Sequence, residues 1–144
     1  VLVVEDSFAI QRMLCQVVRS VGCDVFPENN GRAALVTLNS MGPEAFGLII
    51  CDLMMPQMNG MDFLKAAREK HGDDLPPVLI ASSVNERKTI VLAKNLGIAG
   101  FIVKPFKIQQ LVERIKTVLY GSDDEDSDDG EESADEDSDE EAAS

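Results

Sequence analysis

Polar side chains that could do chemistry follow four separate apolar runs of the sequence. Glu5 and Asp6 come after the first run, Asp52 ends another, and Ser82 and Lys104 follow two more. Three carboxylates held close together repel one another unless a cation neutralises them or one of them binds a proton. An all-oxygen cluster of this kind suits Mg²⁺, a hard ion that keeps several waters and takes one or two carboxylates directly. A carbonyl of the loop after Asp52 could supply another ligand.

These side chains together fit phosphoryl transfer onto a carboxylate. That reaction needs a carboxylate nucleophile, a metal ion that bridges oxygens, and fixed positive charge where negative charge spreads. Lys104 is a point charge that can pair with a carboxylate or a phosphoryl oxygen, and Ser82 is a neutral hydroxyl donor. Each has an ordinary structural alternative, because the acids could cap helices or turns, the serine could end a strand, and the lysine could be solvated. Their order at successive strand ends favours one shared site.

The apolar runs are typical of strands buried on both faces, and the segments between them have apolar residues at helical spacing. We expect strands within 1–4, 25–26, 47–52, 77–81 and 100–103. We expect helices over about 8–21, 31–41, 61–70, 85–95 and 108–119, with Ser7 as the cap of the first.

Five strand–helix repeats with short connections predict an α/β domain with a parallel sheet covered by helices on both faces. Right-handed crossovers place the carboxyl ends of all its strands on one edge, where ligands of open parallel sheets bind. That edge would gather Glu5, Asp6, Asp52, Ser82 and Lys104. We expect the folded domain to span residues 1–120.

Charge is divided unevenly along the chain of 144 residues, whose net charge is -13. Residues 1–120 hold all 13 Lys and Arg and 12 of the 26 acidic residues, so their net charge is +1. Residues 121–144 hold the other 14 acids, no base and no aliphatic residue larger than Ala, and we expect them to form a disordered acidic tail. This tail would be repelled by nucleic acid, and residues 1–120 show no basic patch, so we expect no nucleic-acid binding within this chain.

The three cysteines, Cys15, Cys23 and Cys51, are odd in number, lack metal-ligand spacing and lie in apolar segments. They are typical of buried thiols in a reducing compartment, and we expect a cytoplasmic location. No apolar run approaches the roughly 20 residues that a membrane span needs, and no signal peptide is visible, so no membrane partner is expected. Because the sequence starts at Val1, inside a predicted strand, we take it as a trimmed or partial chain.

Residues 1–120 resemble a response-regulator receiver domain of two-component signalling, and are similar to the single-domain chemotaxis regulators. Four motifs carry the resemblance in register: VVEDS at 3–7, CDLMMPQMNG at 51–60, PVLIASS at 77–83 and FIVKPF at 101–106. The resemblance implies a flavodoxin-like (βα)₅ doubly wound parallel sheet with strand order 2-1-3-4-5.

The resemblance also implies roles for single residues. Asp52 would be the phosphoacceptor and would take a phosphoryl group from a phosphohistidine on a sensor histidine kinase or a histidine phosphotransfer protein. Glu5, Asp6, Asp52 and the Met54 carbonyl would hold Mg²⁺. Lys104 would contact the phosphoryl group, and its peptide bond to the following proline is typically cis in the family.

The same resemblance implies a switch. Ser82 would swing toward the phosphoryl oxygen, and Phe101 would turn inward behind it. This would reshape the face made by the fourth helix, the fifth strand and the fifth helix, which binds an unknown downstream protein. Such a domain is no enzyme on other substrates, since it catalyses only its own phosphorylation and slow dephosphorylation. Serine in place of the frequent threonine keeps the hydroxyl, and phenylalanine in place of the frequent tyrosine loses the phenol donor.

Two apolar residues predict a long-lived phosphorylated state. Met54 stands two positions after Asp52, and Val84 stands two positions after Ser82. In receivers these positions flank the path of the attacking water, and neither side chain can orient a water for in-line attack. We therefore expect slow self-dephosphorylation.

Phe8 precedes the apolar stripe of the first helix. An exposed aromatic beside the phosphoacceptor resembles the patch where family members receive a phosphotransfer helix bundle. A partly buried phenylalanine that only packs against the domain is the alternative.

Two other functions are compatible with parts of the pattern. One is a non-phosphorylated module of receiver fold that recruits partners through its fold and acidic tail. The other is a phosphatase or phosphotransferase that turns over through an aspartyl phosphate, which a second acid two residues beyond Asp52 would have supported; Met54 stands there. No P-loop or Rossmann glycine fingerprint is present, so nucleotide binding is not expected.

Overall fold

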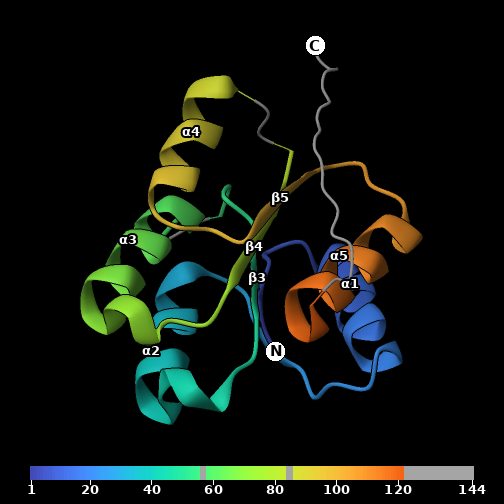
Figure 1. Cartoon of the computed structure of the whole chain (residues 1–144), viewed down its shortest axis with the longest axis horizontal. Helices are drawn as coiled ribbons and strands as arrows, with labels where there is room; N and C mark the ends of the chain where they lie inside the picture. The colour runs from blue at the N-terminus through green and yellow to red at the C-terminus, as the bar shows by residue number, and fades with distance from the viewer. Residues whose placement is uncertain (56–57, 84–85, 122–144) are drawn as a thin grey trace.

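A five-stranded parallel sheet forms the centre of the computed structural model, which describes residues 1–55, 58–83 and 86–121 (Figure 1). Neighbouring strands run parallel in the order β2-β1-β3-β4-β5. The strands are β1 (Leu2–Val4), β2 (Phe26–Glu28), β3 (Ile49–Cys51), β4 (Val78–Ser82) and β5 (Gly100–Val103). The predicted flavodoxin-like α/β fold and its strand order are confirmed.

Helices cover both faces of this sheet (Figure 1). Within the described ranges the α-helices are α1 (Phe8–Ser20), α2 (Gly31–Met41), α3 (Gly60–His71), α4 (Arg87–Asn95) and α5 (Ile108–Tyr120). Helices α1 and α5 lie on one face, and α2, α3 and α4 lie on the other. Two short 3₁₀ helices, η1 (Pro43–Ala45) and η2 (Gly72–Asp74), follow α2 and α3. The sequence patterns did not predict them.

Alternating side chains of the central strands supply two separate cores. Leu2 and Val4 of β1 pack with Phe63 of α3, whereas Val3 between them packs with Ile115 of α5, and all five side chains are fully buried. Apolar residues on both sides of a strand explain why the runs show no polar alternation. Burying one such side chain contributes roughly 1.5–3 kcal/mol, so the two cores hold the strand ends firmly in place.

The edge strand β2 lies later in the chain than predicted. It spans Phe26–Glu28 rather than 25–26, with Pro27 opposite Val3 of β1. An edge strand pairs on one side only, so it tolerates a proline and exposed side chains that the hydrophobic pattern cannot register. The predicted bounds were wrong because they were based on buried apolar residues, whereas this strand lies at an exposed edge of the sheet.

Side-chain caps explain where three helices begin. Ser7, Asn30 and Asn59 precede α1, α2 and α3, and the side-chain oxygen of each accepts a hydrogen bond from the backbone N–H three residues later, at 3.4, 2.8 and 2.9 Å. Helix α4 begins at Arg87 rather than near 85, and Val84 and Asn85 lie outside the described residues. Helix α5 ends at Tyr120, and residues 122–144 of the predicted tail also lie outside the described residues.

None of the helices in the described ranges combines the length and the hydropathy that crossing a lipid bilayer requires. Cys15 and Cys51 are buried free thiols, as predicted, but Cys23 is half-exposed. Cys23 follows the end of α1, packs partly against the core between the sheet and α5, and its Sγ lies 3.7 Å from the Tyr120 hydroxyl oxygen.

Candidate functional site

Three carboxylates lie together at the carboxyl ends of β1 and β3. Glu5 is 1% exposed and Asp52 is 6% exposed, whereas Asp6 faces solvent. One carboxylate oxygen from each of the three lies within 4.8 Å of the others. The strand register causes this meeting, because Val4 pairs with Cys51 and the Asp52 N–H donates to the Val4 carbonyl at 3.0 Å.

Lys104 brings a cation from the end of β5. Its Nζ donates to Glu5 Oε1 at 2.8 Å and to Asp52 Oδ2 at 3.2 Å, and its side chain is 14% exposed. Its backbone N–H donates to the Ser82 carbonyl at 2.8 Å, which fixes the residue to the end of β4. The peptide bond between Lys104 and Pro105 is cis. We call Glu5, Asp6, Asp52 and Lys104 the acid pocket.

Proximity and burial shift the pKa values of two groups in the acid pocket. Burial raises the pKa of Glu5; the hydrogen bonds from Lys104 and from the Ser7 N–H oppose this rise, and the nearby charge of Asp52 adds to it. Burial by itself would lower the pKa of Lys104, but its hydrogen bond to Glu5 and the negative charges of Asp52 and Glu5 raise this pKa above its ordinary value. Lys104 therefore remains an ammonium at neutral pH.

Backbone donors orient the two buried carboxylates. The Ser7 N–H donates to Glu5 Oε2 at 3.1 Å, and the Met54 N–H donates to Asp52 Oδ1 at 3.2 Å. Every oxygen of both carboxylates thus has a protein donor. The Met54 side chain is 61% exposed, and the role of its carbonyl as a metal ligand stays a prediction.

Helix α3 begins directly against the chain that follows Asp52. A Cβ atom at Gly60 would collide with the Asp52 carbonyl oxygen and would lie 2.7 Å from the Leu53 Cα. The Gly60 N–H donates to the Leu53 carbonyl at 3.0 Å. Only glycine permits this approach, which supports the end of β3 that carries Asp52.

Gln11 of α1 is a supporting residue that sequence reasoning missed. Its Nε2 donates to the carbonyls of Glu5 and Glu28, at 3.0 and 3.2 Å, and to Asn29 Oδ1 at 2.8 Å. The side chain therefore joins α1 to the carboxyl ends of β1 and β2. The available signal was weak: a polar residue one turn after the Ser7 cap, next to the apolar stripe.

Ser82 and Phe101 have different relations to the acid pocket. Ser82 is fully buried and pairs with Val103 in the sheet, so it ends its strand next to Lys104. Phe101 lies opposite Ile80, half-buried against the core under α2 and α3, and is not part of the acid pocket. Their predicted switch roles stay predictions.

The acid pocket can be compared with known families. Residues 1–116 match the family described as response regulator receiver domain. This chain belongs to that family. Receiver domains are signalling modules rather than a family of catalytic enzymes, and they use Mg²⁺, for which three convergent carboxylates are a fitting donor set.

Curated relatives of this receiver domain are longer proteins. The DNA-binding response regulator MtrA of Mycobacterium tuberculosis is 33% identical over 125 residues, which cover 87% of this chain and 52% of that protein. The transcriptional regulatory protein CpxR homolog of Haemophilus influenzae is 34% identical over 121 residues, covering 84% of this chain and 50% of that protein. The chain thus spans about half the length of these curated relatives.

Solved receiver structures share the fold. The chemotaxis protein CheY4 of Vibrio cholerae superposes with a TM-score of 0.73 at 30% identity, covering 82% of this chain and 96% of that chain. The likeness to a chemotaxis regulator expected from the four motifs is confirmed at the level of structure.

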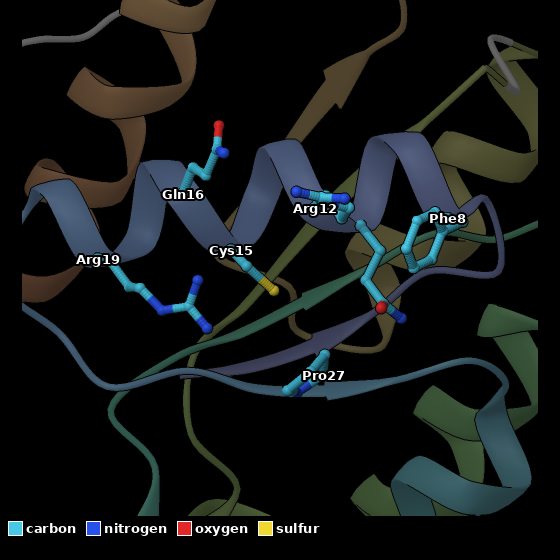
Figure 2. Close-up of a pocket in the computed structure, with 7 residues that line it drawn as sticks. Phe8, Arg12, Cys15, Gln16, Arg19 and Pro27 are labelled. Atoms are coloured by element: carbon cyan, nitrogen blue, oxygen red, sulfur yellow. The ribbon is translucent and has the colours of Figure 1, made fainter.

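The surface of the receiver domain beside the acid pocket carries an exposed aromatic ring. Phe8, the first residue of α1, is 71% exposed, and the guanidinium of Arg12 lies 5.5 Å from the centre of its ring (Figure 2). Of the two alternatives for Phe8, the structure supports the exposed one, and its role in docking stays a prediction.

Proposed function

We propose that this receiver domain accepts a phosphoryl group on Asp52 from the phosphohistidine of a sensor histidine kinase or a histidine phosphotransfer protein. The observation that supports it is the acid pocket: a buried Asp52 beside Glu5 and Asp6, with the Lys104 ammonium 3.2 Å from Asp52 Oδ2. The two curated relatives are named as response or transcriptional regulators, which agrees with a signalling role.

The transfer has a simple balance of bonds. An Asp52 carboxylate oxygen forms a bond to phosphorus while the bond from phosphorus to the donor imidazole nitrogen breaks, and that nitrogen keeps the electron pair. Lys104 provides fixed positive charge next to the oxygens over which negative charge spreads. Glu5, Asp6, Asp52 and the Met54 carbonyl would hold Mg²⁺, which when bound supplies positive charge against the repulsion between carboxylates and phosphoryl oxygens.

The new phosphoryl group is proposed to act as a switch. The Ser82 hydroxyl would turn toward it, and the half-buried Phe101 would turn inward. The face formed by α4, β5 and α5 would change as a result, and these three elements carry the exposed apolar residues Leu92, Val103 and Ile108. We propose that an unidentified downstream protein, rather than nucleic acid or membrane, reads this face, and that the domain acts in the cytoplasm.

Incubation with acetyl phosphate and Mg²⁺, followed by intact mass spectrometry, tests this function. The native chain should gain the mass of one PO₃ group, and the Asp52→Asn variant should gain none. Omission of Mg²⁺ should abolish the gain in the native chain. An unmodified native chain would instead support a non-phosphorylated interaction module, and equal labelling of the variant would place the phosphoryl group elsewhere.

The phosphorylated state is predicted to decay slowly, because the exposed Met54 side chain cannot orient water beside Asp52. The second residue of this prediction, Val84, lies outside the described residues. The measurement is the decay of the labelled mass in Mg²⁺ without any phosphatase, with Met54→Asn expected to decay faster. A native half-life of seconds would contradict the prediction.

A further inference from the structure

A shallow groove of about 320 Å³ runs along the exposed side of α1. Its lining includes Phe8, Arg12, Cys15, Gln16, Arg19 and Pro27 (Figure 2). We call it the α1 groove. Phe8 and Pro27 are its apolar lining residues, and two arginines, each about one helical turn from the buried Cys15, border it.

The α1 groove has positive charge without a negative partner. Arg12 and Arg19 are exposed, none of the lining residues is acidic, and neither arginine forms an ion pair with a carboxylate in the part of the chain that the structure describes. Arg12 instead lies against the ring of Phe8. Exposed guanidinium groups without a carboxylate partner can bind the carboxylates of another segment, because the geometry of their N–H donors fits a carboxylate.

The chain itself contains a segment of complementary charge. Residues 121–144 hold 14 acidic residues and no base, whereas residues 1–120 are close to neutral. We propose that the acidic segment of residues 123–141 binds the α1 groove of the same molecule.

The end of α5 starts this segment close to the groove. The Tyr120 hydroxyl donates to the Val21 carbonyl at 3.2 Å, and its oxygen lies 3.7 Å from Cys23 Sγ. The segment therefore leaves the domain beside the end of α1, two residues beyond Arg19. From Val21 to Arg12 the helix axis spans only about 14 Å, and twenty extended residues reach roughly 65 Å, so the segment is long enough.

Tethering favours this segment over a free acidic peptide. Exposed ion pairs are individually weak, so an untethered peptide would rarely occupy the groove. A segment joined to the domain by a short linker has an effective concentration on the order of millimolar, which compensates for weak pairs.

Occupation of the α1 groove would cover Phe8. If the proposed function holds, the acidic segment then competes with the histidine donor for the same surface and slows transfer to Asp52. Binding of the segment does not depend on phosphorylation, so the two proposals can fail separately.

The test uses two-dimensional ¹H–¹⁵N NMR of the full chain at low and high salt. Raising ionic strength from about 0.01 M to about 1 M shortens the screening length from about 30 Å to about 3 Å and should release the segment. We expect amide signals of α1 around Arg12 and Arg19 to shift together with signals of residues 123–141. The Arg12→Gln/Arg19→Gln variant should lose these salt-dependent shifts, whereas the control Arg32→Gln/Arg87→Gln, which removes two exposed arginines elsewhere, should keep them.

A variant with Asp123→Asn, Asp124→Asn, Asp126→Asn and Asp128→Asn should reduce the shifts on α1, and it changes no residue of the folded domain. Shifts on α1 that are absent, or that persist in the Arg12→Gln/Arg19→Gln variant, would overturn the proposal. Shifts that grow with protein concentration would assign the groove to a second copy of the chain and would also overturn it. Acetyl phosphate labelling of Asp52 is unaffected by any of these outcomes.

Discussion

The acid pocket and the α1 groove border the same helix but hold their charges in opposite ways. In the acid pocket, Glu5 and Asp52 are almost fully buried, and Lys104 pairs with both. In the α1 groove, Arg12 and Arg19 are exposed and have no carboxylate partner among the described residues.

The cost of desolvation explains this difference. A buried charge must be compensated within the fold, so its partners are fixed in advance and ready for a reacting group. An exposed charge costs little when it is unpaired, so it stays available for a segment or protein that arrives and leaves. The first arrangement suits chemistry, and the second suits reversible docking.

Lys104→Gln should break the acid pocket and produce the largest effect. Two buried carboxylates lose their cation, so we expect the free energy of unfolding to fall by about 2 kcal/mol, less than a fully buried pair would lose. Phosphorylation by acetyl phosphate should slow by roughly 100-fold, because fixed positive charge is lost beside the transferring group. Urea unfolding with and without Mg²⁺ measures the first effect, and Mg²⁺ should recover part of the loss.

The difference in stability between the native chain and Lys104→Gln should depend on pH, and the pKa of Lys104 determines the direction of this dependence. The pKa of Lys104 is raised above its ordinary value of 10.5, so its stabilisation is complete below pH 10.5 and is lost as pH rises through the higher folded pKa. The difference in stability between native chain and variant should therefore shrink above pH 10.5. Lys116→Gln, which removes an exposed lysine of α5, serves as the control. An equal loss of unfolding free energy in both variants would contradict a specific stabilising role of Lys104 in the acid pocket.

Gln11→Ala should have an intermediate effect. It removes the side-chain donor that joins α1 to the ends of β1 and β2, and we expect a loss of about 1 kcal/mol in the free energy of unfolding. Gln16→Ala, an exposed glutamine on the same helix, should change stability by less than about 0.5 kcal/mol. Indistinguishable unfolding midpoints for the two variants would show that Gln11 does not support the pocket.

Phe8→Ala should have the smallest effect on the fold and a selective effect on function. The ring is largely exposed, so stability should change by less than about 0.5 kcal/mol. Transfer from the cognate histidine donor should slow several-fold, because the donor protein loses an apolar contact, while labelling by acetyl phosphate stays the same. Val36→Ala on α2, also an exposed apolar residue, is the control. Equal slowing with both phosphoryl donors would contradict a docking role.

The central strands could be predicted from the sequence because their signal and their burial coincide. Ile49 and Ile80 are fully buried on one face of the sheet and Ile50 is fully buried on the other. An uninterrupted apolar run indicates this burial on both faces directly. The residues of the acid pocket followed, since a parallel sheet brings the ends of its strands to one edge. The bounds of the edge strand β2 were misplaced because Phe26 and Pro27 are exposed and Glu28 is a half-buried charged residue, so the strand shows no such pattern.

Other features depend on contacts between distant residues, which a local pattern does not contain. The hydrogen bond from Gln11 to Glu28 joins residues 17 positions apart. The α1 groove likewise requires that Pro27 of β2 lies beneath α1. Residue types and their spacing in the sequence do not predict a surface groove. The sequence shows the charge imbalance of the chain, but the proposed binding site of the acidic segment depends on the contact between the ends of α1 and α5.

The close contact at Gly60 has a consequence for how this domain tolerates mutation. No heavy atom fits there, although Gly60 has no side chain that could bind an ion or accept a phosphoryl group. A saturation library scored only by signalling output would rank this position with the reactive residues. Parallel abundance measurements would separate them, because a methyl group at residue 60 displaces the main chain, whereas loss of the carboxylate at residue 52 removes the proposed phosphoacceptor and leaves the main chain in place.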